Sequence, residues 1–141
     1  MNLIGPISYN SLVLPMVGTR ICAGFPSPAD DFLDDEIDLA RILMPNRVAT
    51  FLWRVAGSSM IDAGIQDGSV VVVDRSAKPK HGDVVVASID GMISLKLFQN
   101  DGKLSLAFAN RTMPSFTVDE TATTEIWGVV TWTLHQPSLK S

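Results

Sequence analysis

The sequence contains very few of the residues that form metal centres and disulfide bonds. Its 141 residues include one cysteine, Cys22, and two histidines, His81 and His135. A single cysteine excludes an internal disulfide framework and suits a reducing compartment. The two histidines are far apart and lack the ligand spacing of a zinc site, and no glycine-rich phosphate loop is present. We therefore expect neither a metal nor another cofactor.

Charge is also scarce, and the positive charges are outnumbered. Charged residues make up 18% of the chain, and the net charge is −4. Binding to nucleic acid needs a basic surface, so direct DNA binding is not expected. No hydrophobic run reaches membrane-spanning length, and no charged residue precedes Arg20, so the start lacks the basic front of a secretory signal. These absences predict a cytoplasmic protein that does not contact a membrane.

Hydrophobic residues are abundant, and they are distributed differently in two parts of the chain. They make up 46% of the sequence, enough for one domain with a substantial core. Residues 1–47 carry five prolines and show no regular hydrophobic periodicity, which predicts an extended N-terminal arm. From residue 48 to residue 141, short β-rich runs alternate with turn residues. The second part is therefore predicted to be the folded domain.

The arm contains an acidic cluster and one candidate helix. Six acidic residues lie between positions 30 and 38, where they form either a solvated surface or a patch that recognises a partner. A short helix is expected over Asp38–Leu43. Asp35 or Asp38 would cap it, and Pro45 would end it.

The domain that follows is predicted to be mostly β. Asp67-Gly68, Asp90-Gly91 and Asp101-Gly102 are typical of tight turns between antiparallel strands, and Met60–Ile65 of a single helical turn. The expected architecture is a curled antiparallel sheet, or one that is barrel-like. The predicted strands are Thr50–Val55, Ser69–Asp74, Asp83–Ile89, Met92–Phe98, Lys103–Ala109, Ser115–Val118 and Glu125–Leu134.

A small-residue turn at Gly57-Ser58-Ser59-Met60 is the first candidate for chemistry. Gly57 allows a tight bend, and the paired serines place a hydroxyl and backbone N–H groups at its tip. By itself such a turn is usually ordinary loop structure. The functional interpretation is that Ser59 is a nucleophile.

Lys96 is the second candidate, because it interrupts an apolar strand. Alternation along Ile93–Phe98 allows Lys96 to face solvent while its neighbours face the core. Burial would instead lower its pKa and allow it to act as a general base. A free lysine, with a pKa of about 10.4, is neutral in only about one molecule in 2,500 at pH 7. A Ser-His-Asp triad with His81 or His135 has no supporting local motif.

The third candidate is a segment of the arm, Ala23-Gly24-Phe25-Pro26. An extended stretch with two small residues at its centre is open to attack and has the form of a protease substrate. The alternative is a linker that merely turns. Cys22, beside it, has no neighbouring base and is interpreted as an ordinary apolar residue.

Taken together, these motifs resemble the UmuD/MucA proteins, relatives of the self-cleaving domain of LexA-type repressors in peptidase family S24. The order and spacing of three separate motifs match over almost the full length of the chain. The residues that carry the resemblance are Ala23 to Ala29, Gly57 to Gly68, Val73-Asp74, His81-Gly82-Asp83 and Lys96.

The resemblance implies a serine endopeptidase with a Ser/Lys dyad that cuts its own chain between Ala23 and Gly24. Ser59 would attack, Lys96 would remove its proton, and the backbone N–H groups of Ser58, Ser59 and Met60 would hold the oxyanion. In the family, cleavage follows DNA damage and is stimulated by RecA on single-stranded DNA. The shortened homodimer then serves a UmuC-like Y-family polymerase, of the polymerase V type, in SOS mutagenesis and translesion synthesis.

Only 23 residues precede Gly24, which leaves no room for the winged-helix domain of a repressor and favours the mutagenesis branch.

Two points remain open at this level. A non-catalytic module that binds the polymerase or RecA with the same fold is the alternative to the enzyme. Cleavage within one chain and cleavage between two chains are both compatible with the length of the arm.

Overall fold

The computed structural model of the chain describes residues 10–18, 20–21, 23–25, 33–113 and 122–138, with the side chains of residues 33–35 left out. The chain divides into two compact units, Met1–Pro45 and Asn46–Ser141. Among the described residues, no helix is both long enough and apolar enough to cross a membrane.

In its described residues, the first unit contains a two-stranded antiparallel ribbon and one short helix. Strand β1 (Val13–Val17) pairs with β2 (Leu33–Asp38), and α1 (Leu39–Leu43) follows β2 directly. The carboxylate of Asp38 accepts hydrogen bonds from the backbone N–H groups of Leu12 at 3.0 Å and Arg41 at 3.4 Å. The predicted helix and its Asp38 cap are therefore confirmed, and the pairing of β1 with β2 was not predicted.

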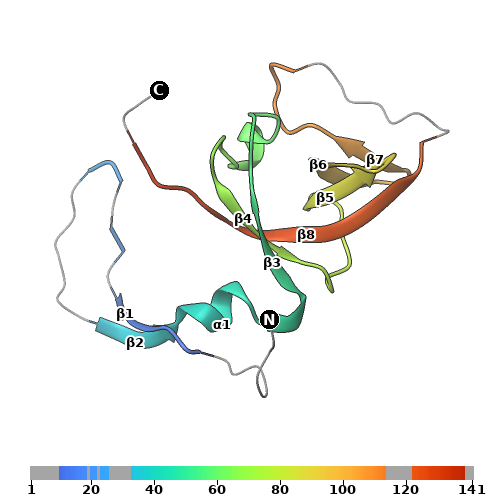
Figure 1. The fold of residues 1–141 in the computed structure, drawn as a ribbon. Helices are drawn as coiled ribbons and strands as arrows, with labels where there is room; N and C mark the ends of the chain where they lie inside the picture. Colours follow the sequence, from blue (N-terminus) through green and yellow to red (C-terminus); the bar gives the residue numbers. More distant parts are fainter. Residues whose placement is uncertain (1–9, 19, 22, 26–32, 114–121, 139–141) are drawn as a thin grey trace. The chain divides into compact units, whose positions relative to one another are not determined.

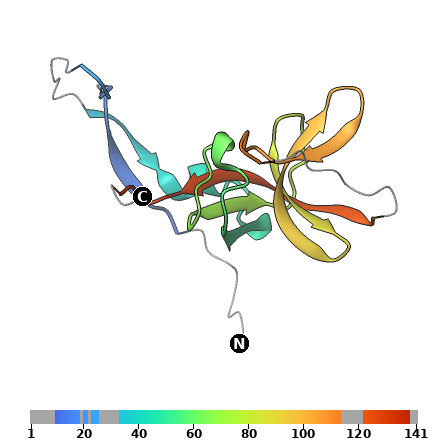
Figure 2. The same cartoon turned by 90° about the horizontal axis from the view of Figure 1, so that it is seen from above.

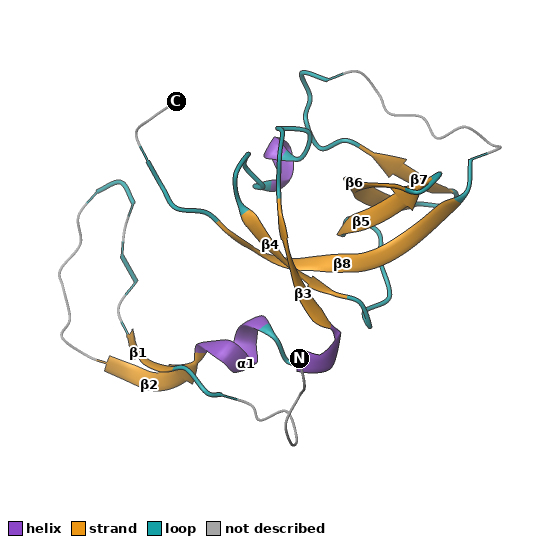
Figure 3. Cartoon of the chain, in the orientation of Figure 1, coloured by secondary structure: helices purple, strands orange, loops and turns teal. Residues whose placement is uncertain are grey.

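The second unit is a six-stranded antiparallel sheet with the strand order β3-β4-β8-β5-β6-β7 (Figures 1 and 3). Two short 3-10 turns, η1 (Arg47–Ala49) and η2 (Ile61–Ala63), accompany it. Six of the predicted strands are present, with ends that differ by one or two residues, and Ser115–Val118 lies outside the described residues. The strands are β3 (Thr50–Arg54), β4 (Val70–Asp74), β5 (Val84–Ile89), β6 (Met92–Asn100), β7 (Leu104–Ala107) and β8 (Thr124–Leu134).

Strand β8 joins the two halves of this sheet. Its C-terminal part pairs with β4 and its N-terminal part with β5, and the register shifts once in each pairing, at Thr131 and at Trp127. Such bulges bend a strand and increase its twist, which agrees with the long curved course of β8 in Figure 2. The strand order is open, with β3 and β7 at its edges. The mostly β antiparallel class is thus confirmed, and the sheet is not closed into a barrel.

Two of the three predicted turns connect neighbouring strands. Asp90 and Gly91, with φ of 51° and 82°, join β5 to β6, and Gly102, with φ of 107°, lies between β6 and β7. Asp67-Gly68 is not a hairpin turn, because it ends a longer connection that contains Ser59 and η2. The N–H of Gly68 closes this connection by donating to the carbonyl of Val55 at 2.9 Å.

The core lies on both faces of the sheet. Successive residues of a strand point to opposite faces, so the neighbours Val85 and Val86 belong to different clusters. One cluster combines Met60 and Ile65, from the connection after β3, with residues of β4 and β5. This cluster forms the floor under the Ser59 turn.

Candidate functional site

Ser59 lies in a turn that is fixed at both ends. Gly57 has a φ of 97°, which favours glycine, and its N–H donates to the carboxylate of Asp67 at 2.7 Å. On the other side of Ser59, the side chain of Met60 is 1% exposed and packs in the core. Ser59 itself is half-buried. Core packing of its neighbour therefore fixes the backbone that carries the Ser59 hydroxyl.

A segment far along the chain is bonded to this turn. The backbone N–H of Ala109 donates to the carbonyl of Ser59 at 2.9 Å, and Nδ2 of Asn110 donates to the carbonyl of Ser58 at 2.7 Å. Asp62 in turn donates its N–H to the carbonyl of Ala109 at 2.6 Å. We call Ala109–Arg111 the clamp segment.

Lys96 is buried in β6, with an exposed fraction of 5%. Its Nζ donates to Ser94 Oγ at 2.6 Å and to the carbonyl of Leu95 at 3.2 Å, and it lies 5.0 Å from the centre of the Phe108 ring. Because burial disfavours the ammonium, it lowers the pKa of Lys96 below its ordinary value. The alternative in which Lys96 faces solvent is therefore wrong.

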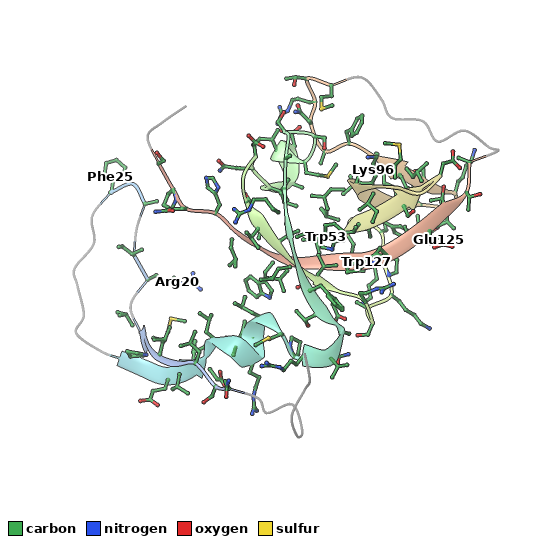
Figure 4. All side chains as sticks on the ribbon, in the orientation of Figure 1. Arg20, Phe25, Trp53, Lys96, Glu125 and Trp127 are labelled. Carbon is green, nitrogen blue, oxygen red and sulfur yellow. The ribbon has the colours of Figure 1, made fainter. Side chains whose placement is uncertain are left out.

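One apolar pocket brings the two parts of the site together. Ser59 and Met60 line it from one side, and Ser94 and Leu95, the two hydrogen-bond partners of Lys96 Nζ, line it from another. Its volume is about 320 Å³, and Trp53 forms a further wall. Figure 4 shows Trp53 and Lys96 on β3 and β6, two strands whose residues border this space. The pocket is thus bordered by the candidate nucleophile and by the two hydrogen-bond partners of the buried amine.

The segment around Ala23 and Gly24 belongs to the first unit and is exposed. The exposed fraction is 95% for Ile21 and 91% for Phe25, and a Cβ placed on Gly24 would meet no atom within 4 Å. Cys22 lies outside the described residues. The described part of this segment is sterically open, as a substrate for cleavage must be.

The histidines are not part of the site. His81 Nδ1 accepts a hydrogen bond from the N–H of Asn100 at 2.9 Å, and His135 Nδ1 lies 3.4 Å from Oγ of the buried Ser69. Neither histidine lines the pocket of Ser59. No group of three or more potential metal ligands occurs within the part of the chain that the structure describes.

Three residues of the site were not identified from the sequence: Ser94, Phe108 and Asn110. Ser94 precedes Lys96 by two positions, so the period of a strand could have placed the two on one side of β6. Asn110 is separated from Ser58 by 52 positions, and no local pattern marks it.

A serine turn and a buried lysine on a mostly β domain define a class of candidate hydrolases, and the family comparison agrees. The family model described as Peptidase S24-like matches residues 15–131. The chain therefore belongs to the peptidase S24-like family.

Comparison with individual relatives shows which proteins of this family the chain is similar to. ImpA of Salmonella typhimurium is 39% identical over 131 residues, which cover 93% of this chain and 90% of ImpA. MucA of Escherichia coli is 40% identical over 122 residues, covering 86% of this chain and 84% of MucA. The LexA repressor of Clostridium kluyveri is 35% identical over 108 residues, which cover 76% of this chain but only 53% of the repressor. The predicted resemblance to the UmuD/MucA proteins is confirmed.

Proposed function

We propose that the protein is a serine endopeptidase that cleaves its own chain between Ala23 and Gly24 by means of a dyad of Ser59 and Lys96. The observation that carries this proposal is the burial of Lys96 beside the pocket of Ser59. A base must be neutral to accept a proton, and burial is the effect that lowers the pKa of this amine.

The reaction follows from the roles of these residues. As Ser59 Oγ bonds to the carbonyl carbon of Ala23, its proton passes to the neutral amine of Lys96, and the carbonyl oxygen becomes an oxyanion held by backbone N–H groups. When the oxyanion collapses, the bond to the nitrogen of Gly24 breaks, and the Lys96 ammonium returns its proton to that nitrogen. Water then hydrolyses the ester on Ser59.

Substrate and enzyme belong to one molecule or to one dimer, so regulation can act on docking. In this proposal residues 1–47 are the arm that carries the cleavage site, and residues 48–141 are the peptidase domain. A RecA filament on single-stranded DNA that binds the docked form better would shift the population. Moving docking from 1:99 to 99:1 requires about 5.5 kcal/mol of differential binding.

The biological role proposed here is that of the UmuD/MucA branch. The shortened homodimer would serve as the accessory subunit of a UmuC-like Y-family polymerase in SOS mutagenesis, in the cytoplasm, without binding DNA itself. The similarity to MucA and ImpA over most of the chain supports this assignment.

Cleavage at alkaline pH tests the enzymatic part. Raising the pH increases the neutral fraction of Lys96, so we expect the cleavage rate to rise with pH and to level off above the lowered pKa. Intact mass spectrometry should reveal a fragment that begins at Gly24, and Ser59→Ala should abolish it. If the wild type and Ser59→Ala stay equally intact, with or without RecA filaments, the chain is a binding module instead of a peptidase.

A further inference from the structure

Three successive backbone carbonyl groups in the Ser59 turn accept hydrogen bonds. The Ser58 carbonyl accepts from Asn110 Nδ2 at 2.7 Å, and also from the N–H of Ile61 at 3.2 Å. The Ser59 carbonyl accepts from the N–H of Ala109 at 2.9 Å, and the Met60 carbonyl from the N–H of Ala63 at 3.0 Å. The three peptide planes that follow Ser58, Ser59 and Met60 are therefore anchored through their oxygens.

Anchoring a carbonyl also orients the next N–H group. The two groups of a trans peptide lie in one plane and point in opposite directions. The bond from Asn110 to the Ser58 carbonyl therefore turns the N–H of Ser59 away from the clamp segment, and the bond from Ala109 to the Ser59 carbonyl does the same for the N–H of Met60. Both N–H groups belong to the peptides that border the pocket.

These two N–H groups are available for a further bond. No acceptor is present for either of them among the residues that the structure describes, although Met60 is only 1% exposed. A buried N–H without an acceptor costs free energy and is rare in folded proteins. An acceptor that appears only during the reaction would account for it, because an oxyanion needs donors already in place.

The side chain of Asn110 is itself held in one orientation. Asn110 Oδ1 accepts from both the N–H of Thr112, at 3.0 Å, and its Oγ1, at 2.6 Å. With the oxygen committed to Thr112, the amide nitrogen is the group that faces Ser58. The clamp segment is further tied to the turn by the N–H of Arg111, which donates to the carboxylate of Asp62 at 2.6 Å.

We propose that Asn110 is a positioning residue that sets the oxyanion-binding N–H of Ser59 by holding the Ser58 carbonyl. This inference rests on the proposed function. Asn110 would touch neither the substrate nor the reacting atoms. Its effect would pass through one peptide plane, so it should alter the rate of the chemical step and leave the titration of Lys96 unchanged.

The test is the pH profile of self-cleavage in full-length Asn110→Ala. Loss of a donor from an oxyanion hole lowers the rate about 10²–10³-fold, and a donor that is present but misoriented should cost less, about 10-fold to 100-fold. We expect the plateau rate to fall by that amount while the midpoint of the profile stays in place, because the substitution changes no charge. Thr112→Val, which keeps the bond to Ser58, is the matched control and should lose much less.

A second variant separates a specific loss of rate from a general loss of structure. Asn110→Asp keeps the size of the side chain and the bonds to Thr112 but turns an acceptor toward the Ser58 carbonyl, so its plateau rate should fall at least as far. The thermal midpoint of each variant, followed by circular dichroism, should lie well above the assay temperature.

Labelling of Ser59 by an alkyl fluorophosphonate reports on the hydroxyl and the N–H groups without docking of the arm, and Asn110→Ala should slow it. Equal plateau rates in Asn110→Ala and the wild type, or a midpoint that moves with the rate, would overturn the inference. Absence of cleavage in the wild type would instead contradict the proposed function.

Discussion

Lys96 combines two properties that oppose each other in a folded protein. The residue is only 5% exposed, yet its amine has hydrogen-bond acceptors in Ser94 and Leu95. The acceptors favour the ammonium and burial disfavours it, and burial dominates, because the pKa is lowered. The residue proposed as the general base is therefore one that the fold accommodates at a cost.

Replacing Lys96 with methionine should show this cost as a gain in stability. Because the pKa is lower in the folded state than in the unfolded state, the unfolded chain binds more protons, and wild-type stability rises with pH between the lowered pKa and about 10.5. We expect Lys96→Met to melt at a higher temperature than the wild type at pH 7, with a difference that narrows as the pH approaches 10.5. Thermal unfolding across this pH range is the measurement.

Lys103→Met is the control, since Lys103 is exposed. A methionine at position 96 that lowers the melting temperature at pH 7, or a difference that grows toward high pH, would show that burial of the amine is not costly. Ser59→Ala should be combined with each variant so that self-cleavage does not alter the sample.

Two residues of the candidate site could be singled out from the sequence because their local pattern is unusual, whereas the residues whose contacts depend on the fold could not. Ser59 follows a glycine in a small-residue turn, and Lys96 interrupts an apolar strand, so both stand out within a few positions. Asn110 shows no such contrast, because its proposed role depends on a contact between the clamp segment and a turn 52 positions earlier. The partners of a polar side chain across a sheet cannot be read from its neighbours in the chain.

At the scale of elements, strands with clear alternation were predictable and their irregularities were not. The ribbon of β1 and β2 was missed because Pro15 interrupts β1 and acidic residues dominate β2, so neither shows the usual strand pattern. The bulges at Trp127 and Thr131 were also missed. They exist because β8 must pair with β4 and β5 at once, which is a property of the sheet and not of β8 alone.

Gly128, beside the first bulge, is the position in β8 where this packing is tightest. A Cβ there would lie 2.7 Å from Val73 Cγ1 and 3.2 Å from the backbone oxygen of Asp74. Since the backbone of β4 cannot easily move, we expect Gly128→Ala to lower the free energy of unfolding by about 1–3 kcal/mol. Urea denaturation measures this. Glu125→Ala, at an exposed position of the same strand, should change it by less than about 0.5 kcal/mol, and equal effects would contradict the explanation.

At the scale of the whole molecule, the two units have unequal means of stabilisation. The sheet of the second unit buries two clusters, one on each face. In the first unit, by contrast, all five residues of β1 are exposed, and a two-stranded ribbon is marginal by itself. The candidate substrate thus lies in a weakly stabilised unit, and the candidate catalyst lies in a stable one. This difference suits a reaction that is controlled by docking.

Limited proteolysis with trypsin should reveal this inequality. Arg20 is exposed in the first unit, whereas Arg54 lies in the β3 ladder and the N–H of Arg75 donates to the carbonyl of Ala49 at 2.8 Å. Because cleavage needs a locally extended backbone, we expect the first cut after Arg20, giving a fragment that begins at Ile21. Arg20→Gln should remove this fragment without exposing the sheet. Early cuts at Arg54 or Arg75 would mean that the second unit opens as readily as the first, so that control of cleavage could not lie in docking alone.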